Sequence, residues 1–449
     1  MSHFRFIHTA DIHLGSLLHI DSPDQEMAAY AREAVYDAFE RLCIGAIDQG
    51  VDFLLLAGDL YDSDSKNVFA NQFFIQMCRM LGDRGINLYV IAGNHDPLNK
   101  QWEYFKLPDN VFVFPADKHQ VYKIKREGQT LARLVGQSYK TKWVSKPVYE
   151  EFDMPGDGIF NIAMLHTQLD PSDKKYTPAT ATQLMKNPHI HYWALGHVHK
   201  PEIVNSQGPV IAYPGIPQGR DFGEQGLGGA YLVEVDRSGN ASMTYMVTSP
   251  VIYTSIEIDI SSEDLRAAGS LDELEDYILD RARGLAAFEA NKLLVDLPAI
   301  TSKGGSQDTQ GYVVRWIIRG RGELHKLLRD LSDDAESDLA QGLRKRLSGL
   351  SPFVWTDSIQ IRTAMPITKD ILSDHSRIID MLDQTMAALL QDEEEANSLK
   401  AKMGGLWTSH EDPEDKDDLK FYLDDETFKV MGQHAKQLIL EKLIDGVGE

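Results

Sequence analysis

The stretch that decides the fold class is Leu88-Tyr89-Val90-Ile91-Ala92-Gly93-Asn94-His95-Asp96. It begins as a short apolar run with β-branched residues, which is typical of a buried strand, and passes through a glycine into polar side chains. The same layout occurs at Phe4–Thr9 before Asp11 and at Phe53–Ala57 before Asp59. Strands that end in this way predict an α/β domain whose polar side chains gather beyond the carboxyl ends of its strands.

The same alternation of strands and helices extends over about residues 1–250. Further strands are expected at Phe160–Leu165, His191–Leu195, Val210–Ala212, Tyr231–Val235 and Met243–Val247. Two amphipathic helices separate the first three strands. The first has a core-facing stripe of Val35, Ala38, Phe39, Leu42 and Ala46, and the second covers Val68–Leu81.

The pattern changes after Pro250. One strand–helix–strand unit is expected from Ile256–Ile260, Leu271–Arg283 and Leu293–Leu297, and a similar unit from Val313–Ile318, Glu323–Leu331 and Ile359–Arg362. The linker Ser302–Ser306 separates them. We therefore predict a first domain at residues 1–250, a smaller α+β domain at 251–365 and a helical, acidic C-terminal region at 366–449.

The region after Thr368 is expected to be mostly helical. The spacing of three and four residues typical of a coiled-coil seam links Leu372, His375, Ile379, Leu382, Met386 and Leu389. A last amphipathic helix carries Ala435, Leu438, Ile439 and Leu443. These helices either pack locally or dock onto a helix of a partner, and the sequence leaves both interpretations open. The acidic run from Glu411 to Glu426 is expected to be an exposed, mobile segment.

The composition indicates a soluble globular protein of more than one domain. The chain has 449 residues, of which 43% are hydrophobic and 25% charged. We expect no membrane span and no signal peptide, because no apolar run is long enough and the N-terminus enters a strand directly. Cys43 and Cys78 lie in helical apolar stripes and are expected to be small buried hydrophobes, which fits a reducing cytoplasm.

The net charge of −23 excludes a protein that holds nucleic acid through a general basic coat. A polyanionic substrate would need metal ions, a partner or local basic clusters. Candidate clusters are Lys123, Lys125 and Arg126; Lys140, Lys142 and Lys146; and Arg344, Lys345 and Arg346. Each is more typical of an ordinary solvated surface than of a binding site for a polyanion.

Five segments carry residues that commonly bind metals. They are Asp11-Ile12-His13, Gly58-Asp59, Gly93-Asn94-His95-Asp96, His166 and Gly196-His197-Val198-His199. Each motif alone is weak, but all five follow predicted strands, so their side chains can converge on one crevice. Oxygen donors mixed with imidazoles suit manganese, iron or zinc, whereas a set of aspartates alone would suit magnesium better. We interpret His3, His8, His119, His189 and His191 as structural.

The donor set predicts a centre of two divalent ions that hydrolyses a phosphoester. Two such ions carry four positive charges, of which two aspartates and a bridging hydroxide cancel three. One positive charge therefore remains for the phosphoryl oxygens, and the hydroxide is the expected nucleophile. His95 can stand beside the metals and either donate a proton to the leaving oxygen or form a hydrogen bond to the pentacovalent transition state. Asp96 is expected to fix the tautomer of an imidazole.

These motifs resemble the pattern of the calcineurin-like metallophosphoesterases, D-x-H, G-D, G-N-H-[DE], H and G-H-x-H, over about residues 4–248. The resemblance implies a sandwich of two mixed sheets flanked by helices. It also implies one metal on Asp11, His13, Asp59 and His199, and a second on Asp59, Asn94, His166 and His197. His95 matches the catalytic histidine of that family.

Two features distinguish the branches of this family. The protein phosphatases carry an arginine after the second aspartate motif, whereas Ser63 follows Asp62 here, and their third motif ends in Glu rather than in Asp96. The motifs, with the block Tyr213–Arg220, look closest to the SbcD- and YhaO-type DNA repair exonucleases. One departure is that Ser63–Asn67 lacks the proline common in SbcD-type proteins, so a loop that faces DNA there would differ.

That branch implies a manganese-dependent DNA phosphodiesterase that works from 3′ ends and on hairpins or single strands. Fe2+, Zn2+ and Mg2+ stay open as metals. It also implies a capping domain, an SMC-like ATPase partner of the SbcC kind and a homodimer. Arg220 is either a phosphate contact or part of a structural salt bridge. The alternatives are a phosphodiesterase of cyclic nucleotides or other small molecules, and a scaffold subunit whose main role is to bind the ATPase.

Overall fold

The computed structural model describes residues 3–20, 25–62, 67–98, 106–170, 172, 174–286, 299–300, 309–329, 335–366, 380–381, 384–385, 431 and 435. The chain forms two compact units. One comprises residues 1–255, 282–315 and 347–357, and the other comprises residues 256–281, 316–346 and 358–449.

Several predicted features lie outside the described residues. They are the strand Leu293–Leu297, the linker Ser302–Ser306, residues 63–66 of the loop Ser63–Asn67, the acidic run and, apart from isolated residues, the C-terminal helices. The domain boundaries at residues 250 and 365 therefore stay predictions.

The first of two large sheets has the strand order β14-β12-β11-β1-β2-β3-β4. The strands are β1 Phe4–Thr9, β2 Phe53–Ala57, β3 Asn87–Ile91, β4 Val111–Val113, β11 Gly229–Val235, β12 Ala241–Val247 and β14 Ala299–Ile300. Neighbours β1, β2 and β3 are parallel, whereas β11 pairs with β1 in the antiparallel sense. The carboxyl ends of β1, β2 and β3 therefore lie along one edge.

The second large sheet has the order β5-β6-β7-β8-β10-β9. The strands are β5 Gln120–Arg126, β6 Gln129–Gly136, β7 Phe160–His166, β8 Tyr192–Gly196, β9 Glu202–Asn205 and β10 Val210–Tyr213. The inner strands β6, β7, β8 and β10 are parallel, and the outer strands β5 and β9 are antiparallel to their neighbours. This sheet is also mixed, with its inner carboxyl ends on one edge.

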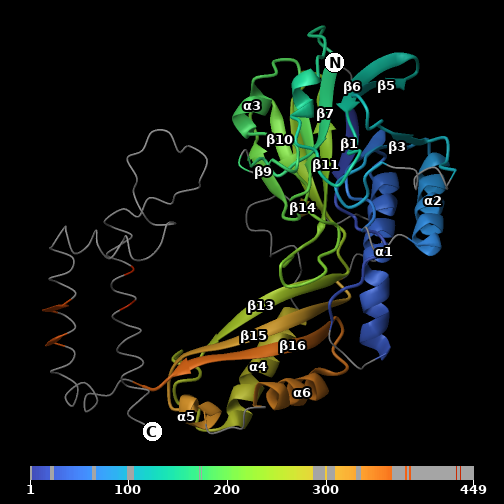
Figure 1. The fold of residues 1–449 in the computed structure, drawn as a ribbon. Helices are drawn as coiled ribbons and strands as arrows, with labels where there is room; N and C mark the ends of the chain where they lie inside the picture. Colours follow the sequence, from blue (N-terminus) through green and yellow to red (C-terminus); the bar gives the residue numbers. More distant parts are fainter. Residues whose placement is uncertain are drawn as a thin grey trace. The chain divides into compact units, whose positions relative to one another are not determined.

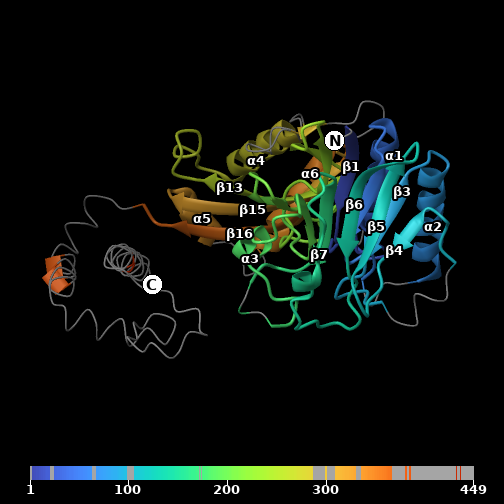
Figure 2. The same ribbon diagram turned by 90° about the horizontal axis from the view of Figure 1, so that it is seen from above.

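Two helices cover the outer face of the first sheet. Figures 1 and 2 show α1 (Gln25–Asp48) and α2 (Val68–Gly82) side by side there. Their apolar stripes meet, as in the stacked rings of Phe39 and Phe74 at 5.9 Å, and complete a core with the sheet. Cys43 and Cys78 are buried free cysteines in this core, which confirms the prediction that they act as small hydrophobes.

The two large sheets pack face to face through aromatic side chains. Phe6 on β1 meets Tyr192 on β8 edge to face, with 5.3 Å between the ring centroids. His8, the next inward residue of β1, is fully buried at the same interface. Its Nε2 donates to the carbonyl oxygen of Leu195 (3.0 Å), so its Nδ1 accepts from the Tyr192 hydroxyl (2.9 Å). The structure thus confirms the predicted sandwich of two mixed sheets.

A third sheet has the order β13-β15-β16, with β13 Val251–Asp259, β15 Gly311–Arg321 and β16 Phe353–Ala364. The remaining helices are α3 Ala181–Met185, α4 Leu271–Ala286, α5 Leu324–Arg329 and α6 Ala335–Leu347, with a 3-10 turn at Val148–Glu151. Helix α6 was not predicted. None of the described helices is long and apolar enough to cross a bilayer.

Candidate metal centre

The five predicted motifs meet at one edge of the sandwich. Asp11 and His13 follow β1, Asp59 follows β2 and Asn94 follows β3, all from the first sheet. From the second sheet, His166 is the last residue of β7, and His197 and His199 follow β8. Backbone contacts tie the loops together, because the amide of His197 donates to both carboxylate oxygens of Asp11 at 2.9 and 3.1 Å.

Two groups of donor atoms form, each within 4.8 Å across. One consists of Asp11, His13 and His199, and the other of Asp59, His166 and His197. In the first group the Nε2 atoms of His13 and His199 face each other at 3.2 Å. In the second group Asn94 Oδ1 lies 2.9 Å from His166 Nε2 and 3.0 Å from His197 Nδ1.

The Asp59 carboxylate lies between the two groups. Its Oδ2 is 3.5 Å from His166 Nε2 and 4.0 Å from His13 Nε2, and its Oδ1 accepts the backbone N–H of His95 at 2.9 Å. This is the place of a shared ligand. The resemblance assigns that role to the same residue.

The loops that carry these ligands adopt unusual backbone conformations. Of the seven described residues other than glycine with positive φ, four are predicted ligands: Asp11, His13, Asp59 and His197. Left-handed backbone at residues with side chains costs free energy and often marks functional sites. Close approach explains one glycine, because a Cβ on Gly93 would stand 2.2 Å from Asp59 Oδ1.

The donor set fits divalent cations. Asp11, His13, Asp59 and His166 are at most 1% exposed, and in the described structure His13 Nδ1 has no hydrogen-bond partner. Ring nitrogens and an amide oxygen face one another at close to 3 Å, an arrangement that a cation between them would stabilise. Carboxylates in such surroundings need compensating positive charge.

The electrostatics of these side chains show the same need for positive charge. Burial raises the pKa of Asp11 to about 6 against the opposing effect of His166 and His199. Burial also acts to raise the pKa of Asp59, but His166 and His13 hold it well below its usual range. In turn, burial opposes protonation of His166, yet Asp59 raises its pKa to about 9. A proton on His166 therefore compensates part of the negative charge of these carboxylates, whereas burial lowers the pKa values of His13 and His197.

His95 lies beside the first group, with its ring centroid 4.9 Å from that of His13. Its Nδ1 is 3.0 Å from Asp62 Oδ1, and Asp62 also accepts from the Ser16 hydroxyl at 3.1 Å. In the sequence analysis Asp62 only helped to distinguish the branches of a family. The contact between Asp62 and His95 was not predicted. The structure also makes His13, Asp62 and His95 a third group of donor atoms.

The carboxylate of Asp96 is placed differently from our expectation. It accepts backbone N–H groups of Gly93 (2.9 Å), Leu60 (3.0 Å) and Tyr61 (3.2 Å), and so joins the loops after β2 and β3. Burial, followed by the charge of Asp59, raises its pKa to about 8, although these amides act in the opposite direction. The carboxylate that faces the His95 imidazole is that of Asp62, because Asp96 turns back toward its own loop.

Arg220 forms a partly buried ion pair with Glu224, at 2.6 Å between Nη2 and Oε1. Glu224 also lies 2.6 Å from His199 Nδ1. Burial would raise the pKa of this carboxyl, but His199 and Arg220 hold it well below its ordinary range. Sequence reasoning missed Glu224, which stands outside all five motifs. The only signal was its spacing of four residues from Arg220.

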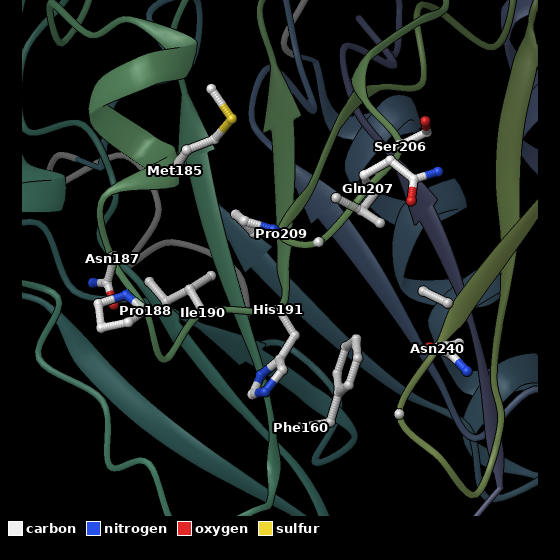
Figure 3. Close-up of a pocket in the computed structure, with 14 residues that line it drawn as sticks. Phe160, Met185, Asn187, Pro188, Ile190, His191, Ser206, Gln207, Pro209 and Asn240 are labelled. Atoms are coloured by element: carbon white, nitrogen blue, oxygen red, sulfur yellow. The ribbon is translucent and has the colours of Figure 1, made fainter.

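Two pockets differ in their relation to this centre. A groove of about 720 Å³ opens beside His95, and its lining includes Leu17, Ile20 and Asp221. A second pocket, of about 600 Å³, lies where β7, β8 and β10 begin (Figure 3). Because the ligands lie at the opposite ends of β7 and β8, this second pocket is not part of the metal centre.

The comparisons with known proteins agree with this geometry. Residues 4–201 match the family model for calcineurin-like phosphoesterase. YhaO of Bacillus subtilis, described as an uncharacterised metallophosphoesterase, is 32% identical over 262 residues, which are 57% of this chain and 63% of that protein. The DNA double-strand break repair protein Mre11 of Archaeoglobus fulgidus is 22% identical over 49% of this chain and 51% of its own length.

A shorter match, of 93 residues at 37% identity, links the chain to the SbcD component of the nuclease SbcCD of Bacillus subtilis and covers 20% of this chain and 22% of that component. The matches cover 63% of the length of YhaO and 51% of the length of the archaeal Mre11, so the chain spans less than two thirds of either relative. The matched family region contains all seven predicted ligands and His95. Residues 4–201 therefore form a calcineurin-like metallophosphoesterase domain.

Proposed function

We propose that this protein is a dinuclear-metal phosphodiesterase that cleaves DNA. The observation that carries the proposal is the pair of donor groups that meet at Asp59, with the His95 imidazole beside them. Asp11, His13, Asp59 and His199 would hold one ion, and Asp59, Asn94, His166 and His197 the other. When bound, two such ions lower the pKa of water and neutralise charge on a phosphoryl group.

His95 is the proposed proton donor to the leaving oxygen. Its Nδ1–H donates to the Asp62 carboxylate, which fixes the ring and leaves Nε2 as the atom that exchanges a proton with the substrate. Asp96 supports this geometry indirectly, because its carboxylate holds the backbone of the loop that carries His95. We propose it as a positioning residue.

The groove beside His95 is the proposed path of the substrate. Leu17, 55% exposed, lies in its lining together with Ile20 and can contact a sugar or base. The groove also contains the carboxylates of Asp62, Asp221 and Asp357 and one guanidinium, that of Arg220, which already pairs with Glu224 and lies 3.7 Å from Asp62. These carboxylates repel a phosphate backbone, so affinity for DNA has to come from the metals, from other surfaces or from a partner.

DNA is favoured as the substrate by the relatives, since Mre11 is named as a DNA double-strand break repair protein and SbcCD as a nuclease. The finer parts of the proposal are manganese as the metal, 3′-to-5′ polarity, cleavage of hairpins or single strands, an SMC-like ATPase partner, a homodimer and a cytoplasmic location. The acidic groove favours one second candidate, a phosphodiesterase of cyclic nucleotides, whose substrates carry a single negative charge.

The test is hydrolysis by the full chain with Mn2+ of four substrates: 3′-labelled DNA, 5′-labelled DNA, a labelled hairpin and a cyclic nucleotide. We expect shortening of DNA that depends on Mn2+ and stops with EDTA. The matched control is Asp59→Asn, which removes the shared carboxylate. Turnover of the cyclic nucleotide alone would refute the DNA proposal, and equal activity of the Asp59→Asn variant would point to a contaminating nuclease.

A further inference from the structure

Glu224 is the most buried carboxylate of the site that no metal-binding motif includes. It lies in the loop between β10 and β11, and its side chain is 10% exposed. A carboxylate this far from water is costly unless its oxygens receive hydrogen bonds and its charge is paired. The groups that donate hydrogen bonds to Glu224 therefore indicate its role in the site.

One contact reaches the predicted metal ligand His199. Glu224 Oε1 lies 2.6 Å from His199 Nδ1, a distance typical of a hydrogen bond to a charged acceptor. A carboxylate can only accept, so the proton sits on Nδ1 and the lone pair of the ring is on Nε2. That Nε2 is the atom that faces His13 within the first donor group.

The other contacts come from Arg220 and fix the carboxylate in place. Glu224 Oε2 accepts the backbone N–H of Arg220 at 2.8 Å and its Nε–H at 3.1 Å, while Oε1 also accepts from Nη2 at 2.6 Å. Each oxygen thus has two donors. The guanidinium, 15% exposed, supplies the charge that stabilises the partly buried Glu224 anion, and its Nη1 lies 3.7 Å from Asp62 Oδ2.

In the second donor group, the Nδ1 atom of His166, which points away from Asp59, has a backbone partner instead of a carboxylate. There, His166 Nδ1 lies 2.9 Å from the carbonyl oxygen of Ala57, which is a neutral acceptor. A carboxylate behind an imidazole makes the ring a stronger ligand than a carbonyl does, and it fixes the orientation of the ring. The two halves of the centre therefore differ in the chemistry that supports a histidine ligand.

We propose that Glu224, held by Arg220, is a positioning residue that orients His199 and raises the affinity of one metal site, the site of Asp11, His13 and His199, above that of its neighbour. This inference rests on the dinuclear centre of the proposed function but not on DNA as the substrate. It also gives Arg220 a defined role as the support of Glu224.

The experiment is a titration of the metal-free full chain with Mn2+, followed by calorimetry and by electron paramagnetic resonance. For Glu224→Ala we expect one of two sites to weaken by about 10- to 100-fold, the usual effect of losing such a carboxylate, and the other to stay within about twofold. With two equivalents of Mn2+ per chain, the resonance signal of the variant should contain a smaller share of coupled pairs and a larger share of single ions than that of the wild type. The matched control Glu234→Gln removes a carboxylate that pairs with Arg5 outside the site, and both sites should keep their affinity.

A double-mutant cycle tests whether Glu224 acts through His199. His199→Ala should weaken the same site, and adding Glu224→Ala should then cause no further loss. If Glu224→Ala does not fold, Glu224→Gln is used in its place. This variant keeps a hydrogen-bond acceptor but loses the charge, so it should weaken metal binding at the same site by a smaller factor. Unchanged affinity, equal loss at both sites or full additivity with His199→Ala would overturn the proposal. Two-site binding by a chain that cleaves no DNA would refute only the proposed substrate.

Discussion

His8 makes the stability of the sandwich depend on pH in a way that can be calculated. It ties β1 to β8, the two strands whose ends carry Asp11 and His197. Both ring nitrogens form hydrogen bonds, Nε2 as the donor to Leu195 and Nδ1 as the acceptor from Tyr192. The folded protein therefore favours the neutral form of the imidazole. Burial lowers the pKa of His8 from 6.5 to about 3.

The sign follows from proton uptake. Below pH 6.5 the unfolded chain binds a proton at His8 that the folded protein does not bind until about pH 3, so acid favours unfolding. Each pH unit in this window costs about 1.4 kcal/mol, and at a pH of about 4.5 the loss is about 2.7 kcal/mol. Above pH 6.5 His8 contributes no pH dependence.

Urea denaturation of the metal-free protein at several pH values measures this effect. In His8→Gln the amide can replace both hydrogen bonds without titrating, so the stability difference between wild type and variant should shift by about 2.7 kcal/mol between pH 7 and about 4.5. Comparing the two proteins cancels the other titrating groups. The control His3→Gln changes an exposed histidine and should run parallel to wild type. Parallel curves for His8→Gln as well would refute the reasoning.

Three further predictions concern the site. His95→Ala should lower turnover by about 10²- to 10⁴-fold while calorimetry still finds two bound metals, and loss of the metals would instead make His95 a ligand or a structural residue. Gly93→Ala should weaken metal binding because its Cβ would meet Asp59 Oδ1 at 2.2 Å, whereas Gly284→Ala, with open space around the new Cβ, should bind metal normally. DNA binding without a partner should depend weakly on salt concentration. The slope of the logarithm of the binding constant against the logarithm of the salt concentration should correspond to about two phosphate contacts or fewer, and a slope that corresponds to about six or more would contradict a groove that repels phosphates.

The strands that carry the ligands could be predicted because each is a short, mainly apolar run in which almost every residue is buried. The outer strand β5 could not, since most of its residues are exposed and Lys123 and Lys125 looked like part of a basic cluster. Its hairpin to β6 turns through Glu127 and Gly128, both with positive φ. Lys140 of a second predicted cluster pairs with Asp117 at 2.7 Å, which favours the interpretation of an ordinary surface there.

The predicted ligands meet because parallel strands place their carboxyl ends at one edge, a rule that depends only on sequence order and strand type. Asp62 and Glu224 could not be assigned in this way. Their partners, His95 and His199, are 33 and 25 residues away, and the contacts depend on how loops from different strands approach each other. Pattern and spacing carry no information on such approaches.

A dinuclear centre joined by Asp59 is tested most directly by anomalous diffraction from crystals grown with Mn2+. We expect two peaks about 3.5–4 Å apart with the Asp59 carboxylate between them, one beside His13 and His199 and the other beside His166 and His197. A single peak, or a peak held by His13, Asp62 and His95 in place of either site, would contradict a centre of this kind.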